Sequence, residues 1–335
     1  MASLRSDNPI GYTEMDLIMA FGERKDSYIN TLGANYLKFP LTPIQIMAED
    51  PKVARYSDVE DAKKTLEGQA FHKTQQEFLG SKTLTTEKRT NSISITHEAE
   101  HLTKRSVVVG SVGPKQLMEG LADSLVGARD EEFIQLFVQA NSPTNQTVWT
   151  GSPICSNDHR VPNNSSLRID NLMPDTPLSY ESLQEAVLMS SYFRISTNKS
   201  IGAFKDPVLL HGATNKTIAE QITDCVYEPF TNNNTKNTTY KMRSLQLENL
   251  HPNFQDYWWI VDMAQMNIAN NNGRGIIHAY YWMDQIFADH TQKSFGIPEN
   301  WLAHSHDKFN VFDPLWIVMC PATSNLAGNV DPSII

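Results

Sequence analysis

Residues 67–91, EGQAFHKTQQEFLGSKTLTTEKRTN, are the stretch from which the fold of this chain is worked out. The stretch is almost entirely polar, with five apolar residues: Ala70, Phe71, Phe78, Leu79 and Leu84. Gly80-Ser81 near its middle favours a turn, so the pattern predicts a long polar hairpin. A two-stranded ribbon with so few apolar residues is marginal by itself in water. It is therefore either disordered or held in place by something outside its own fold.

The longest helix signal of the sequence follows this ribbon. Gly113-Pro114 is a good helix start, because proline lacks the N–H group that the first turn leaves unpaired. Apolar residues then recur at helical spacing from Leu117 to Ala140, and Asn141-Ser142-Pro143 ends the pattern. Residues 114–141 are expected to form a rod of about 40 Å. Charged residues on its other side favour an amphipathic helix lying on a sheet over a membrane span.

Composition limits the function classes. The chain has 335 residues, enough for one large or two modest cores. Its 38 acidic and 28 basic side chains give a formal charge of -10, which disfavours a broad grip on nucleic acid. Three cysteines without a CxxC pair indicate neither a disulfide framework nor a zinc site. The start lacks a signal-peptide pattern, and no apolar run is long enough to span a membrane.

The remaining pattern predicts an α+β chain. Strands are expected at 92–96, 207–211, 244–247 and 257–261, and again near the end at 309–312 and 315–319. Helices are expected at 178–193, with Ser179 as N-cap, and at 215–227. The last two strands are expected to return to the sheet of the first domain.

This order of elements resembles the HK97-fold major capsid proteins of tailed bacteriophages, whose parts are the N-arm, E-loop, P-domain and A-domain. Residues 148–159, VWTGSPICSNDH, are similar to the W-x-G-x-x-x-x-S-x-x-H stretch of the Mu-like head-subunit branch. Residues 207–211 with 218–220, and 256–262, are similar to further strand and helix motifs of that branch. The resemblance covers residues 67–335.

The resemblance implies five parts. They are an N-terminal arm (1–64), an E-loop hairpin (65–92), a P-domain with the spine helix (93–205), an A-domain (206–288), and strands returning to the P-domain with a tail (289–335). It also implies that the hairpin lies across an adjacent subunit. The side chains expected to make these intersubunit contacts are Phe71, Lys73, Phe78, Leu84, Lys88 and Arg89.

The function implied is that of a major capsid protein, which assembles as hexamers and pentamers into an icosahedral virion shell around double-stranded DNA. Expected partners are further copies of the chain, a separate scaffolding protein, a portal and a decoration protein, with assembly in the host cytoplasm and no membrane. DNA would be confined without sequence-specific contacts. The alternative is an encapsulin-like compartment that shares the fold and stores cargo enzymes.

Two clusters invite a chemical interpretation. Cys155 with His159 has the residue types of a thiolate and its base, yet no oxyanion-hole pattern accompanies them. His304-Ser305-His306-Asp307 has metal-ligand types without further ligands at a recognisable spacing. The sequence therefore predicts no enzyme, no catalytic residue, no metal and no cofactor.

Overall fold

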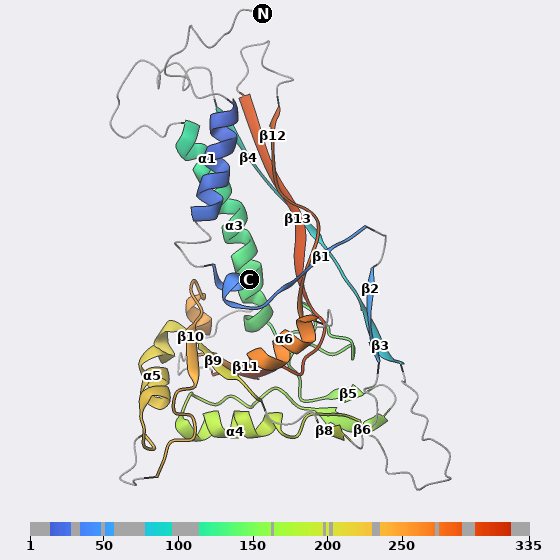
Figure 1. Ribbon diagram of the computed structural model, residues 1–335, viewed down its shortest axis with the longest axis vertical. Helices are drawn as coiled ribbons and strands as arrows, with labels where there is room; N and C mark the ends of the chain where they lie inside the picture. The colour runs from blue at the N-terminus through green and yellow to red at the C-terminus, as the bar shows by residue number, and fades with distance from the viewer. Residues whose placement is uncertain are drawn as a thin grey trace, which may run out of the picture.

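The computed structural model describes residues 14–27, 34–47, 51–56, 78–95, 114–161, 164–196, 199–200, 204–229, 235–271, 275–289 and 299–322. Two four-stranded sheets dominate this part of the chain. One is long and occupies the upper half of Figure 1, and the other is compact and lies in the lower half. The predicted α+β class is confirmed.

The long sheet has the strand order β1 (Thr42–Gln45), β12 (Ile276–Asp289), β13 (Glu299–Val311) and β4 (Glu87–Ile95). β1 runs parallel to β12, and the other pairs are antiparallel. Helix α1 (Glu14–Ser27) lies beside helix α3 (Pro114–Val138) along this sheet (Figure 1). Phe21 of α1 and Leu121 of α3 share a buried cluster with Trp301 of β13.

Helix α3 confirms the predicted spine, although it ends at Val138 rather than at residue 141. Beyond that point the chain turns, and the carbonyl oxygen of Phe137 accepts a hydrogen bond from the indole Nε1 of Trp259 (3.1 Å). Phe133 and Phe137 are buried in a core that contains residues of both sheets. The spine helix therefore joins the two sheets into one body.

The compact sheet has the order β10 (Arg243–Gln246), β9 (Pro207–His211), β11 (Trp258–Asp262) and β14 (Ile317–Cys320). Side chains along a strand point alternately to the two faces of the sheet, and β11 packs into a core on each face. Trp259 and Val261 enter the core below α3, whereas Trp258 and Ile260 enter a second core on the opposite face. A strand buried on both faces explains the unbroken apolar run of its sequence.

Three helices accompany the compact sheet: α4 (Tyr180–Ser190), α5 (Lys216–Asp224) and α6 (Met263–Asn271). The predicted N-cap is confirmed, because the Ser179 side chain accepts a hydrogen bond from the backbone N–H of Ser182. The Ser182 side chain in turn accepts one from the backbone N–H of Ser179. The short elements are η2 (Asn35–Lys38), η3 (Ala213–Asn215), η4 (Pro252–Phe254), β5 (His159–Val161), β6 (Asn164–Ile169), β7 (Arg194–Ser196) and β8 (Lys199–Ser200). Among the helices of the described residues, none is both long and apolar enough to cross a membrane.

Three elements pair or pack with other parts of the chain than the predicted division into domains expects. β12 had been assigned to the A-domain (206–288), but it pairs with β13 along the long sheet. The strand expected to return with β13 to the first domain, β14, pairs with β11 instead. Leu183 and Ala186 of α4 pack in the core of the compact sheet, so this helix does not belong with the spine. Local patterns predicted α4 and β14 but not strand β12, and they did not indicate the long-range partners of these elements.

The hairpin prediction for residues 67–91 also needs correction. Gly80 and Ser81 lie inside strand β3 (Phe78–Thr83) and form no turn. β3 pairs antiparallel with β2 (Lys52–Tyr56), and the chain continues into β4, which pairs with β13. Residues 67–77 lie outside the described residues. The ribbon therefore consists of β2 and β3, and half of it comes from the segment predicted to be the N-terminal arm.

Candidate functional site

The β2–β3 ribbon lies on the side of the molecule away from α1 and α3 (Figure 1). Leu79 and Leu84 are buried in the core that also contains Trp149. From β2, the guanidinium of Arg55 lies 3.6 Å from the carboxylate of Asp313, and both side chains are buried. The ribbon is therefore fixed to the body of its own chain as far as Arg55 and Leu79, the neighbours of its last described pair.

Close backbone packing adds to this attachment at Gly80. A β-carbon at this position would lie 2.7 Å from the carbonyl oxygen of Trp149, a distance that real β-carbons do not show. Trp149 belongs to a tight turn in which Gly151 has a φ of 81°, in the left-handed region that glycine adopts readily. Both glycines are needed for β3 to rest directly on this turn.

Lys82 fastens β3 to strand β13 through polar contacts. Its Nζ donates to the backbone oxygen of Val311 (2.8 Å) and to Oε1 of Gln146 (2.9 Å). Gln146 in turn accepts from the N–H of Val311 (3.0 Å) and donates from Nε2 to the oxygen of Phe309. Burial, with a smaller contribution from the charge of Lys308, lowers the pKa of Lys82 to about 7.

The last pair of the described ribbon presents aromatic surface. The rings of Tyr56 and Phe78 meet edge to face, with centroids 5.8 Å apart. Tyr56 is 45% exposed and Phe78 is 52% exposed, so each ring keeps about half of its surface in solvent. A ribbon that is anchored up to an exposed aromatic pair is suited to contact a surface beyond its own chain.

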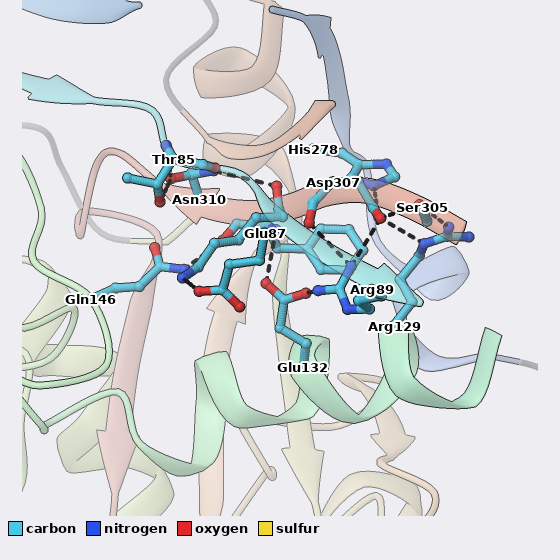
Figure 2. A network of polar contacts seen from close by, with 12 residues as sticks. Thr85, Glu87, Arg89, Arg129, Glu132, Gln146, His278, Ser305, Asp307 and Asn310 are labelled. Atoms are coloured by element: carbon cyan, nitrogen blue, oxygen red, sulfur yellow. Dashed lines mark hydrogen bonds and ion pairs between the residues drawn. The ribbon is translucent and has the colours of Figure 1, made fainter. Parts of the chain in front are cut away.

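Beside the ribbon, a buried polar network joins the spine helix to the long sheet (Figure 2). Its centre is the fully buried carboxylate of Asp307 on β13. Arg129 Nε donates to Oδ2 at 2.8 Å, Arg89 donates to Oδ1 at 2.9 Å, and His278 Nε2 lies 2.7 Å from Oδ2. Ser305 also donates to Oδ1. Four side chains from four elements, α3, β4, β12 and β13, thus converge on one carboxylate.

Electrostatics keep Asp307 ionised. Burial by itself would raise the pKa of this carboxyl, but the His278 hydrogen bond and the charges of Arg129 and Arg89 hold it well below its usual range. Arg89 also pairs with Glu132 of α3, and Arg129 and Lys25 pair with Asp284. The three cations and three carboxylates compensate one another, which is the condition for keeping charges inside a protein.

Asp284 occupies a special backbone position in this network. It lies in β12 where the register with β13 shifts, and its φ is 49°. A non-glycine residue in this region is uncommon and is maintained by its surroundings. Its carboxylate accepts from Arg129 (2.5 Å) and lies 3.5 Å from Nζ of Lys25. The ion pairs of α3 and α1 therefore hold the bulge of the long sheet.

Comparison with solved structures decides the fold. No protein-family model and no curated protein sequence matches the chain. The capsid structure of the cyanophage P-SCSP1u superposes with a TM-score of 0.51 at 9% identity, over 86% of this chain and 88% of the phage chain. The chain has the HK97-like capsid fold. The capsid of a native GTA particle has a TM-score of 0.49 at 12% identity, over 85% of this chain and 88% of the other. The SrpI encapsulin of Synechococcus elongatus has a TM-score of 0.47 at 9% identity, over 90% of this chain and 92% of the other. Both TM-scores are below 0.5, so neither structure is used in the argument.

Within this HK97-like chain, the six residues predicted to contact a neighbour divide into three groups. Phe71 and Lys73 lie outside the described residues. Phe78 and Lys88 are exposed on β3 and β4. Leu84 is buried in the chain's own core, and Arg89 is engaged by Asp307 and Glu132. The contacts that the structure shows for Leu84 and Arg89 are to their own chain, where they hold the ribbon and the sheet.

The sulfur of Cys155 does not have the environment of a nucleophile in this HK97-like chain. The residue is fully buried, and this burial raises the pKa of its thiol far above the usual range. His159 is engaged elsewhere: Nε2 lies 3.1 Å from Oδ1 of Asn171 and Nδ1 lies 3.0 Å from Oγ1 of Thr150. Because the Asn171 oxygen can only accept, Nε2 carries the proton. Burial lowers the pKa of His159 to about 4.

The histidines of residues 304–307 do not form a metal site with Asp307. Alternation along β13 separates them: Asp307 joins the buried network, while His304 stacks on Phe287 and His306 packs against Tyr281. No group of three or more metal-binding side chains occurs among the described residues.

Sequence reasoning missed the buried network of the HK97-like fold. Two signals pointed to it: the strand alternation that turns Asp307 away from its histidine neighbours, and the spacing of Arg129 and Glu132, which places both on one face of the spine helix. The partners are far apart in sequence, and nothing in the local pattern connects them.

Proposed function

We propose that the chain is the major capsid protein of a tailed phage or prophage, assembling as hexamers and pentamers into an icosahedral shell that encloses double-stranded DNA. The observation that carries the proposal is the combination of the HK97-like fold with a ribbon that is anchored along its described length and whose last described pair is aromatic and exposed. The step from fold to function is an analogy, since one fold can serve several functions.

The proposed mechanism is geometric. The buried side chains of the ribbon, Arg55 among them, fix its direction, so that the Tyr56–Phe78 pair meets a neighbouring copy at a defined place. The ion network keeps the spine helix and the long sheet rigid while many such contacts form. Weak contacts repeated by symmetry then close a shell.

The proposed partners follow from this role. Other copies of the chain are the main partner, with a separate scaffolding protein, a portal and a decoration protein acting during assembly in the host cytoplasm. The formal charge of -10 fits a shell that confines DNA without adhering to it.

The proposed role is structural and not enzymatic. Support comes from the Cys155–His159 pair, the strongest nucleophile candidate of the sequence. Its thiol is buried with a raised pKa, and its imidazole is bound to Asn171 and Thr150. The proposal expects Cys155→Ala to leave assembly unchanged.

Imaging of assembled particles together with analysis of their contents tests this function. Shells that contain DNA and carry a portal at one vertex are the expected result. Closed shells that lack a portal and contain a copurifying enzyme would favour the encapsulin-like compartment. Folded protein that forms no shell when a scaffolding protein is supplied would contradict both functions.

A further inference from the structure

A polar pocket lies where β3 meets the turn containing Trp149. Its volume is about 540 Å³, and both lysines of its lining, Lys82 and Lys308, project from strands that meet there. The remaining lining is mainly hydroxyl and amide side chains, including Thr85, Gln146 and Asn310. No carboxylate lines the pocket. The charge of the lining is therefore positive.

The ammonium group of Lys82 is incompletely satisfied. A lysine has three N–H donors, and those of Lys82 have two protein acceptors, the Val311 oxygen and Gln146 Oε1. No carboxylate lies within ion-pairing distance of Lys82 in the described part of the chain. Lys308 differs, because it pairs with Glu87. In its protonated form, Lys82 thus brings an uncompensated charge and a spare donor to the pocket.

Trp149, which also lines the pocket, carries a second unpaired donor. Trp149 is 3% exposed, and its indole Nε1 has no hydrogen-bond partner among the described residues. A buried donor without an acceptor costs about 1–3 kcal/mol, so such groups are usually satisfied by water or a ligand. Gly80 lets β3 approach the Trp149 turn and thereby brings Lys82 and Trp149 into one site.

We propose that this pocket binds an oxyanion, a carboxylate or phosphate group, between Lys82 and Lys308. An oxyanion supplies what the lining lacks, namely negative charge and several acceptor lone pairs. The group comes from one of two sources: an acidic side chain of a neighbouring copy, or a free phosphate-type ion. Only the first source depends on the proposed function.

The bound anion has a measurable effect on Lys82. At pH 7 the amine is about half neutral, since burial and the charge of Lys308 place its pKa at about 7. An anion beside it favours the protonated form, and neutral amines alone react with acylating reagents. A rise of about one pKa unit lowers the neutral fraction at pH 7 about fivefold.

Competitive acetylation read by mass spectrometry tests the site in the unassembled full-length chain. Phosphate or acetate, added to a chloride buffer of matched ionic strength, is expected to slow labelling of Lys82 at pH 7 about fivefold. Labelling of the exposed Lys88 should stay constant. Labelling of Lys82 that is insensitive to both anions would overturn the site and leave a pocket filled by water only.

Assembled particles in chloride buffer distinguish the two sources. Slow labelling of Lys82 without added anion identifies a carboxylate of a neighbouring copy. Fast labelling that phosphate still slows identifies a free ion.

Thermal unfolding of variants provides a separate test. Phosphate should raise the unfolding temperature of the wild type and of Lys88→Met, but not of Lys82→Met. An equal rise in Lys82→Met would also overturn the site, whether or not shells form.

Discussion

The guanidinium of Arg129 on the spine helix donates from Nε to the buried carboxylate of Asp307 on β13 at 2.8 Å. This contact joins residues 178 positions apart in the sequence and connects the spine helix α3 to strand β13 of the long sheet. Because Arg89 and His278 share the same carboxylate, its loss affects more than one partner.

Replacing Asp307 by Asn is expected to destabilise the chain strongly. The change leaves Arg129 and Arg89 without the carboxylate they share, and removing one partner of a buried ion pair costs about 3–5 kcal/mol. Urea unfolding measures the loss. Asp206→Asn is the matched control, because Asp206 pairs with Arg243 at an exposed site. This control should change the free energy of unfolding by less than about 0.5 kcal/mol.

The lowered pKa of Asp307 also predicts a pH dependence. Its folded-state pKa lies below the unfolded value of about 4, so its stabilising effect is complete above that pH and is lost as the pH falls through the folded-state pKa. The wild type minus Asp307→Asn difference should therefore be constant between pH 5 and pH 8. A difference that shrinks within this range would contradict the assigned ion pairs.

A methyl group at position 80 tests the close packing of the ribbon. Gly80→Ala should destabilise the chain by about 1–3 kcal/mol, the usual cost of overpacking, because the new carbon meets the Trp149 carbonyl. Gly120→Ala in α3 is the control: it meets open space and should stabilise the helix by about 0.5–1 kcal/mol. Equal effects of the two substitutions on the free energy of unfolding would contradict the packing of β3 on Trp149.

His159 predicts a second pH dependence, which comes from a buried neutral base and not from a buried carboxylate. Burial holds its pKa at about 4, whereas the unfolded chain protonates near 6.5. Between these values the unfolded state binds more protons, so stability falls as the pH falls, by about 3 kcal/mol in total. His159→Asn should remove this part of the slope, and the exposed His251→Asn should keep it. Parallel stability profiles for wild type and His159→Asn between pH 4 and pH 7 would contradict the neutral, buried imidazole.

The exposed ribbon end should matter for assembly and not for folding. Tyr56→Ala and Phe78→Ala are each expected to change the free energy of unfolding by less than about 1 kcal/mol, since each ring is about half exposed. Both should abolish or distort shells. Tyr192→Ala is the control, because Tyr192 is 64% exposed and lies far from the ribbon in the sequence. Normal shells from Tyr56→Ala and Phe78→Ala, imaged by electron microscopy, would remove the role given to the ribbon.

Elements whose signals are local were predictable from the sequence. The apolar spacing of α3, the Ser179 cap of α4 and the continuous apolar run of β11 each fix an element without knowledge of its partners. The pairing of strands was not predictable in this way. The sequence predicted a turn at Gly80-Ser81, inside β3, and nothing in the local pattern states that β2 rather than the following strand lies beside β3.

For the candidate site, too, local features were predictable from the sequence and long-range contacts were not. Phe78 could be selected as an exposed contact because an apolar residue in a polar ribbon is conspicuous. Arg89 could not be assigned, since the sequence shows its charge and not the carboxylates of Glu132 and Asp307 that surround it. The pocket beside Lys82 depends on three separate segments meeting, which only the folded chain reveals.

The mass distribution of the purified chain as its concentration is raised tests the central claim most directly. One chain has a mass of 37.8 kDa, so a hexamer has about 227 kDa. The account predicts hexamers, pentamers or complete shells. A stable 37.8 kDa monomer at high concentration, even with a scaffolding protein supplied, would contradict it.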